Sequence, residues 1–146
     1  SFYDTTTQSA TAINTAYAMT FNSTDISNGV SVGSPTSRIV VTYAGTYNVQ
    51  FSAQLDQPSG ATAHAYIWLR KNGVDIPSSA GVIAVQGTTA ETVPAWNYLI
   101  SLAASDYIEI MWSVDSTNLK LTYSAAASPV PAIPSVILTV TQVNSI

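Results

Sequence analysis

The chain has 146 residues, which fits a single domain that can bury roughly 68–70% of its unfolded surface without a disulfide or a metal. Cysteine is absent, which excludes thiol chemistry and a disulfide framework. Only 8% of the residues are charged, and the four basic residues against eight acidic ones argue against nucleic-acid binding. With 47% hydrophobic residues, this composition predicts that a partner covers much of the surface of one copy.

The N-terminal third of the chain reads as short candidate strands separated by turns. Residues 1–8 combine two aromatics with a Thr run, residues 17–21 alternate weakly, and residues 38–43 carry consecutive β-branched side chains. Asn28-Gly29 is a turn dipeptide that prefers positive φ. These features favour strands over helices.

Residues 46–55 form the clearest strand, with a strict period of two. Its apolar positions are Tyr47, Val49, Phe51, Ala53 and Leu55. The positions between them are Asn48, Gln50, Ser52 and Gln54. A solvated sheet face normally carries Lys and Glu, so a face of neutral amides and hydroxyls indicates a second surface that is also covered. The alternative is an unusually uncharged face in contact with water.

The rest of the chain continues the pattern. Candidate strands lie at residues 64–71, 82–85, 96–102, 106–112, 119–123 and 135–143. Asn72-Gly73 is the strongest hairpin signal, and a flexible Ala/Ser/Pro stretch at residues 124–134 precedes the last strand. About ten short strands without a helical period or a repeat predict an all-β sandwich or barrel, a single domain over residues 1–146. The predicted core residues are Tyr47, Phe51, Ile67, Leu69, Ile108, Ile110 and Trp112.

Few residues support catalysis. A Ser-His-Asp triad would have to use His64, the single histidine, which an exposed or edge position explains better. Asp106 and Glu109 are three residues apart on one strand and point to opposite faces, so they are a poor acid/base pair. We find no phosphate loop, zinc spacing, run of about 18 apolar residues or leader sequence. We therefore expect no enzyme, no cofactor, no metal and no membrane span.

Several segments resemble a known family in order and spacing. Residues 45–51 (GTYNVQF), 69–73 (LRKNG) and 102–108 (LAASDYI) resemble the globular heads of complement component 1q and the tumour necrosis factor jelly rolls. Residues 2–8 (FYDTTTQ), 22–25 (NSTD), 51–55 (FSAQL) and 132–143 (AIPSVILTVTQV) are similar to virion heads of this type in tailed bacteriophages. One departure is Ser105, where the family commonly has a Gly before the Asp.

The resemblance implies a jelly-roll β-sandwich of about ten strands in two sheets, assembled as a homotrimer. The strand at residues 46–55 would lie in the inner sheet, which faces the threefold axis. The residues this implies for the trimer interface are Phe2, Tyr3, Asn48, Gln50, Ser52, Gln54, Ile137 and Val143.

The resemblance also places the strand at residues 106–112 beside the one at residues 64–71, in the outer sheet. Their residues outside the core would form a partner-binding patch of Tyr66, Trp68, Arg70, Tyr107, Glu109 and Met111. Glu109 could hold Arg70 in place. Alternatively, these side chains only cover the sheet, or lie under the loop at residues 78–87, or recognition lies on the loop tips at residues 56–60 and 115–118.

The function implied is that of a non-enzymatic virion structural protein, the trimeric head of a phage fibre or appendage that mediates host attachment. Its partners would be other virion proteins and a host-surface receptor or glycan. The alternative is a capsid decoration or cement protein that clamps shell subunits with the same trimer. A carbohydrate-directed enzyme is a third, weaker interpretation, because the sequence offers so few catalytic residues.

Overall fold

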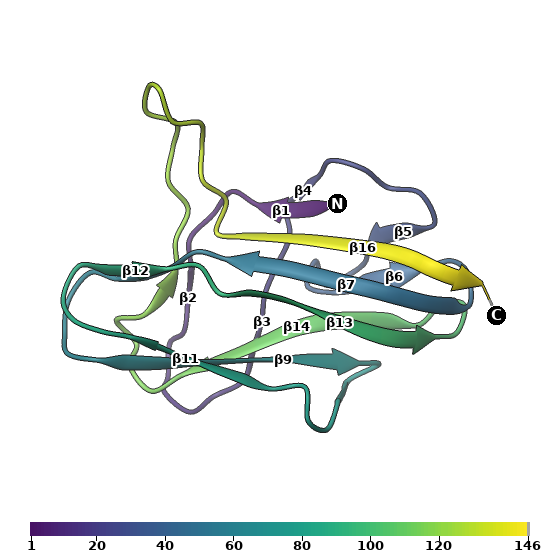
Figure 1. The fold of residues 1–146 in the computed structure, drawn as a ribbon, viewed down its shortest axis with the longest axis horizontal. Coiled ribbons are helices and arrows are strands. Elements are labelled where there is room, and N and C mark those ends of the chain that lie inside the picture. The colour runs from purple at the N-terminus through teal and green to yellow at the C-terminus, as the bar shows by residue number, and fades with distance from the viewer. Residues whose placement is uncertain (146) are drawn as a thin grey trace.

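The computed structural model describes residues 1–145 and contains two main layers of antiparallel β-sheet, with no helix in that range (Figure 1). Within these residues there is accordingly no helix that could cross a membrane. The all-β fold expected from the period-two patterns is confirmed.

The first layer is a five-stranded sheet, and the second is a seven-stranded sheet. The five-stranded sheet has the order β13 (Ala95–Leu102), β7 (Gly45–Ala53), β16 (Val136–Ser145), β1 (Phe2–Asp4) and β4 (Ser23–Thr24). The seven-stranded sheet has the order β10 (Val74–Asp75), β9 (Ala63–Lys71), β14 (Tyr107–Val114), β6 (Ile39–Val41) and β5 (Val30–Val32). Two further strands join it: β11 (Gly81–Val85) pairs with β9, and β3 (Tyr17–Ala18) pairs with β14.

A third, four-stranded sheet extends one end of the first layer, where two sheets in all were expected. Its order is β12 (Ala90–Thr92), β8 (Leu55–Gln57), β15 (Lys120–Leu121) and β2 (Gln8–Ser9). β8 follows β7 after one residue, Gln54, whose N–H donates to Ser135 O at 2.9 Å while its carbonyl accepts from Thr122 N at 2.8 Å. The continuous strand therefore changes partner at Gln54, from β16 to β15. Such breaks and several two-residue strands raise the number of strand segments above ten.

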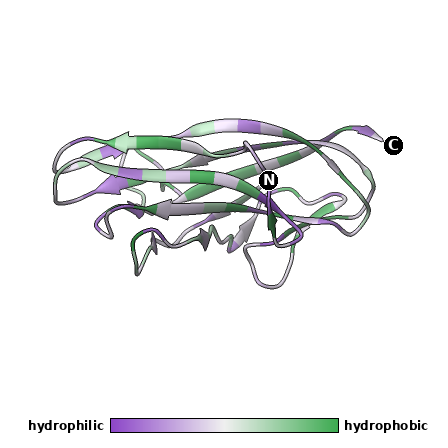
Figure 2. Cartoon of the chain, turned by 90° about the horizontal axis from the view of Figure 1, so that it is seen from below, coloured by the Kyte–Doolittle hydropathy of each residue, from purple (hydrophilic) through white to green (hydrophobic). Residues whose placement is uncertain are grey.

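The core lies between the two layers, and the hydropathy of the strands alternates along their length (Figure 2). All seven predicted core side chains are at most 2% exposed, which confirms the predicted faces of β7, β9 and β14. Phe51 is central: its ring lies 4.7 Å from that of Trp96 in an edge-to-face arrangement and 6.4 Å from that of Tyr98. Aromatic pairs of this kind add to the stability gained from burial alone.

The hairpin predicted at Asn72-Gly73 joins β9 to β10. Asn72 has φ 48° and Gly73 has φ 82°, the left-handed conformations that a two-residue turn of this type requires. Asn72 also ties the turn to the rest of the sheet, because its side-chain oxygen accepts from Tyr107 N at 2.9 Å. The turn therefore fixes the register of β9 against both β10 and β14.

We expect Phe51→Ala to lower the free energy of unfolding by about 3–5 kcal/mol, because it leaves a cavity beside Trp96 and Tyr98. The matched change Gln50→Ala, on the exposed side of the same strand, should change the free energy of unfolding by less than about 0.5 kcal/mol. Urea denaturation of both variants at one protein concentration measures this. Equal, small losses would mean that the two faces of β7 are inverted.

Candidate functional site

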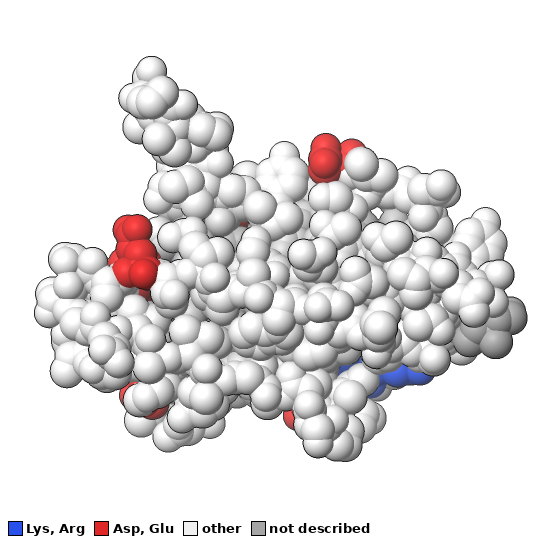
Figure 3. All heavy atoms as spheres, in the orientation of Figure 1, with Lys and Arg blue, Asp and Glu red and all other residues white. Residues whose placement is uncertain are grey.

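The outer face of the five-stranded sheet carries no charged side chain on its three longest strands, β13, β7 and β16. We call this surface the neutral face. Its members are Thr46, Asn48, Gln50, Ser52, Ala95, Asn97, Leu99, Ser101, Ile137, Thr139 and Thr141, with Tyr3 beside them on β1. In Figure 3, neither blue nor red atoms cover the region of these strands, and the acidic groups visible lie toward its rim.

The sheet register arranges the neutral face in rows across the strands. One row holds Leu99, Asn48 and Thr141, and the next holds Asn97, Gln50 and Thr139. Asn97 Nδ2 donates to Asn48 Oδ1 at 2.9 Å across the two rows. Amide and hydroxyl groups thus occupy the centre of the face.

Apolar side chains lie at the margins of the neutral face and next to it. Leu99 is 68% exposed and Ile137 is 40% exposed, and Val143, at an irregularity in β16, is 54% exposed. Tyr3 pairs with Ile137 in the sheet register. A surface of this composition can be covered by a partner without removing a charge from water, so the desolvation cost is limited to polar groups that can be hydrogen-bonded.

The structure brings together most of the residues predicted for the trimer interface. Asn48, Gln50, Ser52 and Ile137 all lie on the neutral face with Tyr3. Gln54 is half-buried in the break between β7 and β8, and Val143 lies near the end of β16.

The assignment of Phe2 to that interface is wrong. Its side chain is 1% exposed and belongs to the hydrophobic core, because alternation along β1 turns Phe2 inward when Tyr3 points outward. The sequence reasoning also missed Asn97, Leu99, Thr139 and Thr141. Residues 96–102 were predicted as a strand, but the outward face of β13 joins the neutral face only because β13 pairs with β7.

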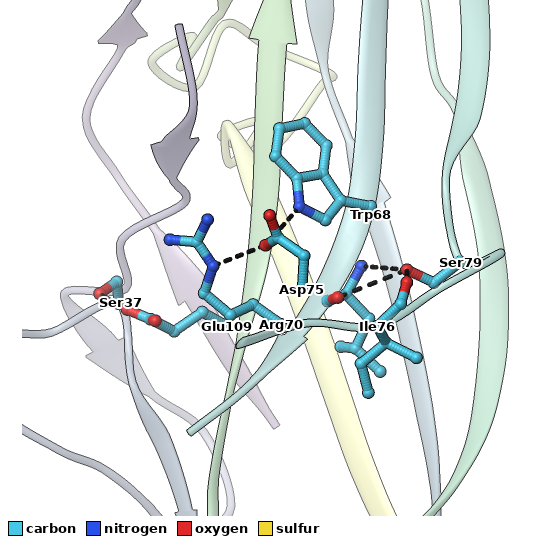
Figure 4. A network of polar contacts seen from close by, with 8 residues as sticks. Ser37, Trp68, Arg70, Asp75, Ile76, Ser79 and Glu109 are labelled. Carbon is cyan, nitrogen blue, oxygen red and sulfur yellow. Dashed lines mark hydrogen bonds and ion pairs between the residues drawn. The ribbon is translucent and has the colours of Figure 1, made fainter. Parts of the chain in front are cut away.

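The second predicted surface, the aromatic patch on the seven-stranded sheet, is partly present. β14 pairs with β9, as expected, and Tyr66, Trp68 and Arg70 share the outer side of β9. Asp75 on β10 lies between two of them: Arg70 Nε donates to its Oδ1 at 2.7 Å and Trp68 Nε1 donates to the same oxygen at 2.8 Å (Figure 4). These bonds lower the pKa of Asp75, the Arg70 bond most, and the same bond raises the pKa of Arg70.

Two predicted members of the aromatic patch are not available to a partner. Met111 is 2% exposed and Glu109 is 8% exposed. Glu109 Oε1 accepts a hydrogen bond from Ser37 Oγ at 2.6 Å, so it is Asp75 and not Glu109 that holds Arg70 (Figure 4). Ser37, in the segment before β6, therefore contacts Glu109, and β3 pairs with β14 at Met111. The loop at residues 78–87 instead supplies β11, which pairs with β9 at the sheet edge.

The other four members of the aromatic patch are exposed or half-buried. Tyr66 is 40% exposed, and Trp68, Arg70 and Tyr107 are half-buried. The guanidinium carbon of Arg38 lies 4.4 Å from the centre of the Tyr107 ring, a cation–π contact. The patch can therefore offer three aromatic side chains and one cation, Arg70, held by Asp75.

His64 pairs with Asp115, its Nδ1 lying 2.7 Å from Asp115 Oδ2. The His64 side chain is 41% exposed, as expected for a histidine near the start of a strand. Among residues 1–145, no three His, Cys, Asp or Glu side chains are grouped so that they could hold a metal ion.

Asp106 closes the turn between β13 and β14 and joins it to the β9–β10 hairpin. Its carboxylate contacts Lys71 Nζ at 2.8 Å and accepts from Asn72 Nδ2 and Ala103 N at 2.7 Å each. Lys71, followed by Asn72, lowers the pKa of Asp106 to about 2. Ser105, before it, has φ 69°, the left-handed conformation that the glycine of the resembled family would adopt with less strain.

We expect Asp106 to make stability depend on pH below about 4. The pKa of Asp106 is about 2 in the folded protein, below the unfolded value of 3.8. Its contribution to the free energy of unfolding is therefore complete above about pH 4 and is lost as the pH falls toward 2. Solvent screens this surface pair, so the contribution should be about 1 kcal/mol. Asp106→Asn should remove that dependence in denaturation measured between pH 2 and 5, while Glu91→Gln, an exposed control, should keep it. Identical pH profiles for Asp106→Asn and the parent would contradict the assignment.

No protein-family model matches this sequence, and no curated protein matches it either.

Proposed function

We propose that this protein is a non-enzymatic structural protein of a bacteriophage particle, a trimeric jelly-roll head on a fibre or appendage that mediates attachment to the host. The observation that carries the proposal is the neutral face. A protein that left this sheet in water would be expected to carry charges there, whereas a subunit of an assembly would not. The phage assignment rests on the resemblance of residues 2–8, 22–25, 51–55 and 132–143 to virion heads.

The order of the long strands supports a jelly roll. One layer reads β13-β7-β16-β1, and the other reads β11-β9-β14-β6. The chain crosses between layers from β6 to β7, from β8 to β9, from β11 to β13, from β13 to β14 and from β14 to β16. Eight strands connected in two facing sheets by repeated crossings are the pattern of a jelly roll.

The composition of the neutral face supports burial against further copies of this chain. Each copy would present the same uncharged surface, so three copies could close a ring around an axis without an unpaired charge in the interface. Exposed Leu99 and Ile137 supply apolar area, and the amides of Asn48, Gln50 and Asn97 supply hydrogen-bond donors and acceptors. Such an interface gains little from ion pairs.

We expect the protein to be a trimer at micromolar concentration and to remain one between about 0.1 and 1 M NaCl, because salt screens only charged interactions. Light scattering coupled to size exclusion gives the mass. Gln50→Arg should weaken association more than a hundredfold, since an uncompensated buried charge costs about 3 kcal/mol or more.

The matched control for that charge is Gln86→Arg, the same substitution at an exposed position after β11. It should leave the trimer intact, and both variants should keep the circular dichroism of the parent. A monomeric parent at micromolar concentration, or equal effects of the two variants, would rule out assembly through the neutral face.

Attachment should depend on the aromatic patch. The double variant Trp68→Ala/Arg70→Ala removes both donors to Asp75 and one half-buried aromatic side chain. It should still form trimers but bind host cells at least tenfold more weakly, about 1.4 kcal/mol. Ile26→Ala, at a residue that is 65% exposed in another loop, is the control. Unchanged binding of the double variant would move recognition to the loop tips at residues 56–60 and 115–118.

The position of the protein in the particle tests the phage assignment itself. Immunogold labelling or a low-resolution map of intact particles should locate it on a fibre, tail or neck. Density spread over the shell would favour the decoration or cement role, and absence from purified particles would refute both.

A further inference from the structure

A narrow arm projects from the sandwich between β15 and β16. It comprises residues 124–134, which leave the sheet where the continuous strand β7–β8 changes partner at Gln54. In Figure 1 it runs crosswise to the strands and extends beyond the edge formed by β1 and β4, and in Figure 3 it stands clear of the rest of the surface. The sequence had suggested a flexible stretch here.

Backbone hydrogen bonds give the arm a defined shape. Ser124 and Ile133 exchange two bonds of 3.0 and 2.8 Å, and Ala127 and Val130 exchange two more of 3.0 and 2.7 Å. All residues from 124 to 132 are exposed, including Val130 at 51%. The protein therefore orders a hairpin of Ala, Pro, Ser and Val side chains and leaves it uncovered by its own sandwich.

The arm and β16 belong to one uncharged stretch of the chain. No charged residue follows Lys120, so the arm and the strand that supplies Ile137, Thr139 and Thr141 to the neutral face are both uncharged. An arm intended for water would be expected to carry charges, because exposed apolar hairpins promote unwanted association.

The base of the arm is continuous with the neutral face. Ala132 and Pro134 line a shallow groove together with Tyr3 and Ile137, two residues of that face and its edge, and Asp25 lies at the side of the groove away from β7. A second copy that covers the neutral face is therefore brought directly to the arm. Because the arm extends sideways, beyond the edge of its own sheet, it can reach the next copy around a ring.

We propose that the arm docks on a neighbouring copy of this chain, lying over the edge of that copy's neutral face and locking the subunits of the assembly together. This rests on the proposed assembly through the neutral face. The arm and the neutral face itself carry no charged side chain, so contact between these two surfaces buries apolar area without desolvating an ion. The arm is ordered before it binds, which lowers the conformational entropy lost on association.

The first test shortens the arm without disturbing the sandwich. Residues 125–132 are replaced by Asn-Gly, which can close a two-residue turn directly on the hydrogen-bonded pair Ser124–Ile133. The expected result is a folded protein whose trimers dissociate at a concentration at least tenfold higher than those of the parent, measured by analytical ultracentrifugation. Unfolding monitored by circular dichroism at high protein concentration checks that the sandwich is intact.

The second test identifies what the arm touches. Since the chain has no cysteine, Val130→Cys gives a single attachment point for a benzophenone photo-cross-linker, and Val82→Cys on β11 is the matched exposed control. Mixing isotope-labelled and unlabelled protein distinguishes cross-links between copies from those within one copy. We expect Val130→Cys to link to β16, β7 or β13 of another copy and Val82→Cys not to do so.

The outcomes separate the arm from the assembly itself. If the parent is monomeric, the proposed assembly and the arm contact both fail. If the parent is a trimer and the shortened variant dissociates at the same concentration, or the cross-links stay within one copy, only the arm contact is overturned. A shortened variant that keeps full trimer stability but no longer binds purified particles would assign the arm to another virion protein and would likewise overturn the proposal.

Discussion

One continuous strand, β7 followed by β8, must serve two surfaces at once. Its inward side chains fill the centre of the core, where Phe51 packs on Trp96, and its outward side chains form the middle of an uncharged sheet face. Successive side chains of a strand point to opposite sides of the sheet. A shift of the strand register by one residue would therefore move the core side chains to the outer face and the outer side chains into the core. The register of β13 and β16 on this strand therefore determines both the stability of one copy and the composition of its outer face.

Charge is confined to other parts of the molecule. The ion pairs Arg70–Asp75 and Lys71–Asp106 lie beside the β9–β10 hairpin, and the hydrogen-bonded pair His64–Asp115 lies near the opposite end of β9. These pairs fasten turns to the seven-stranded sheet, where water can solvate them. The three longest strands of the five-stranded sheet carry no charged side chain, so the two layers have different chemistry on their outer sides and can meet different partners.

The arm follows from the same constraint on β7 and β8. Because β15 and β16 both pair with this strand, on either side of Gln54, the segment between them must leave the sheet and return to it. Within this segment, backbone N–H and C=O groups hydrogen-bond to one another in a short hairpin. The side chains of the hairpin remain exposed to solvent. An uncharged hairpin at the rim of an uncharged face would give the proposed assembly a second contact, at a position set by the sheet.

The sequence determined the local features of this protein: which residues of β7, β9 and β14 face the core, where the Asn72-Gly73 hairpin turns, and that Asn48, Gln50 and Ser52 share a neutral side. Such features depend on the fixed period of a strand and on the backbone preferences of a turn. The tertiary structure alone decided which strands are neighbours, and thus that Asn97 and Thr139 complete the face, that Phe2 is in the core, and that Ser37 buries Glu109. These contacts join residues far apart in the chain, and no local pattern encodes which distant strand or loop will supply the partner.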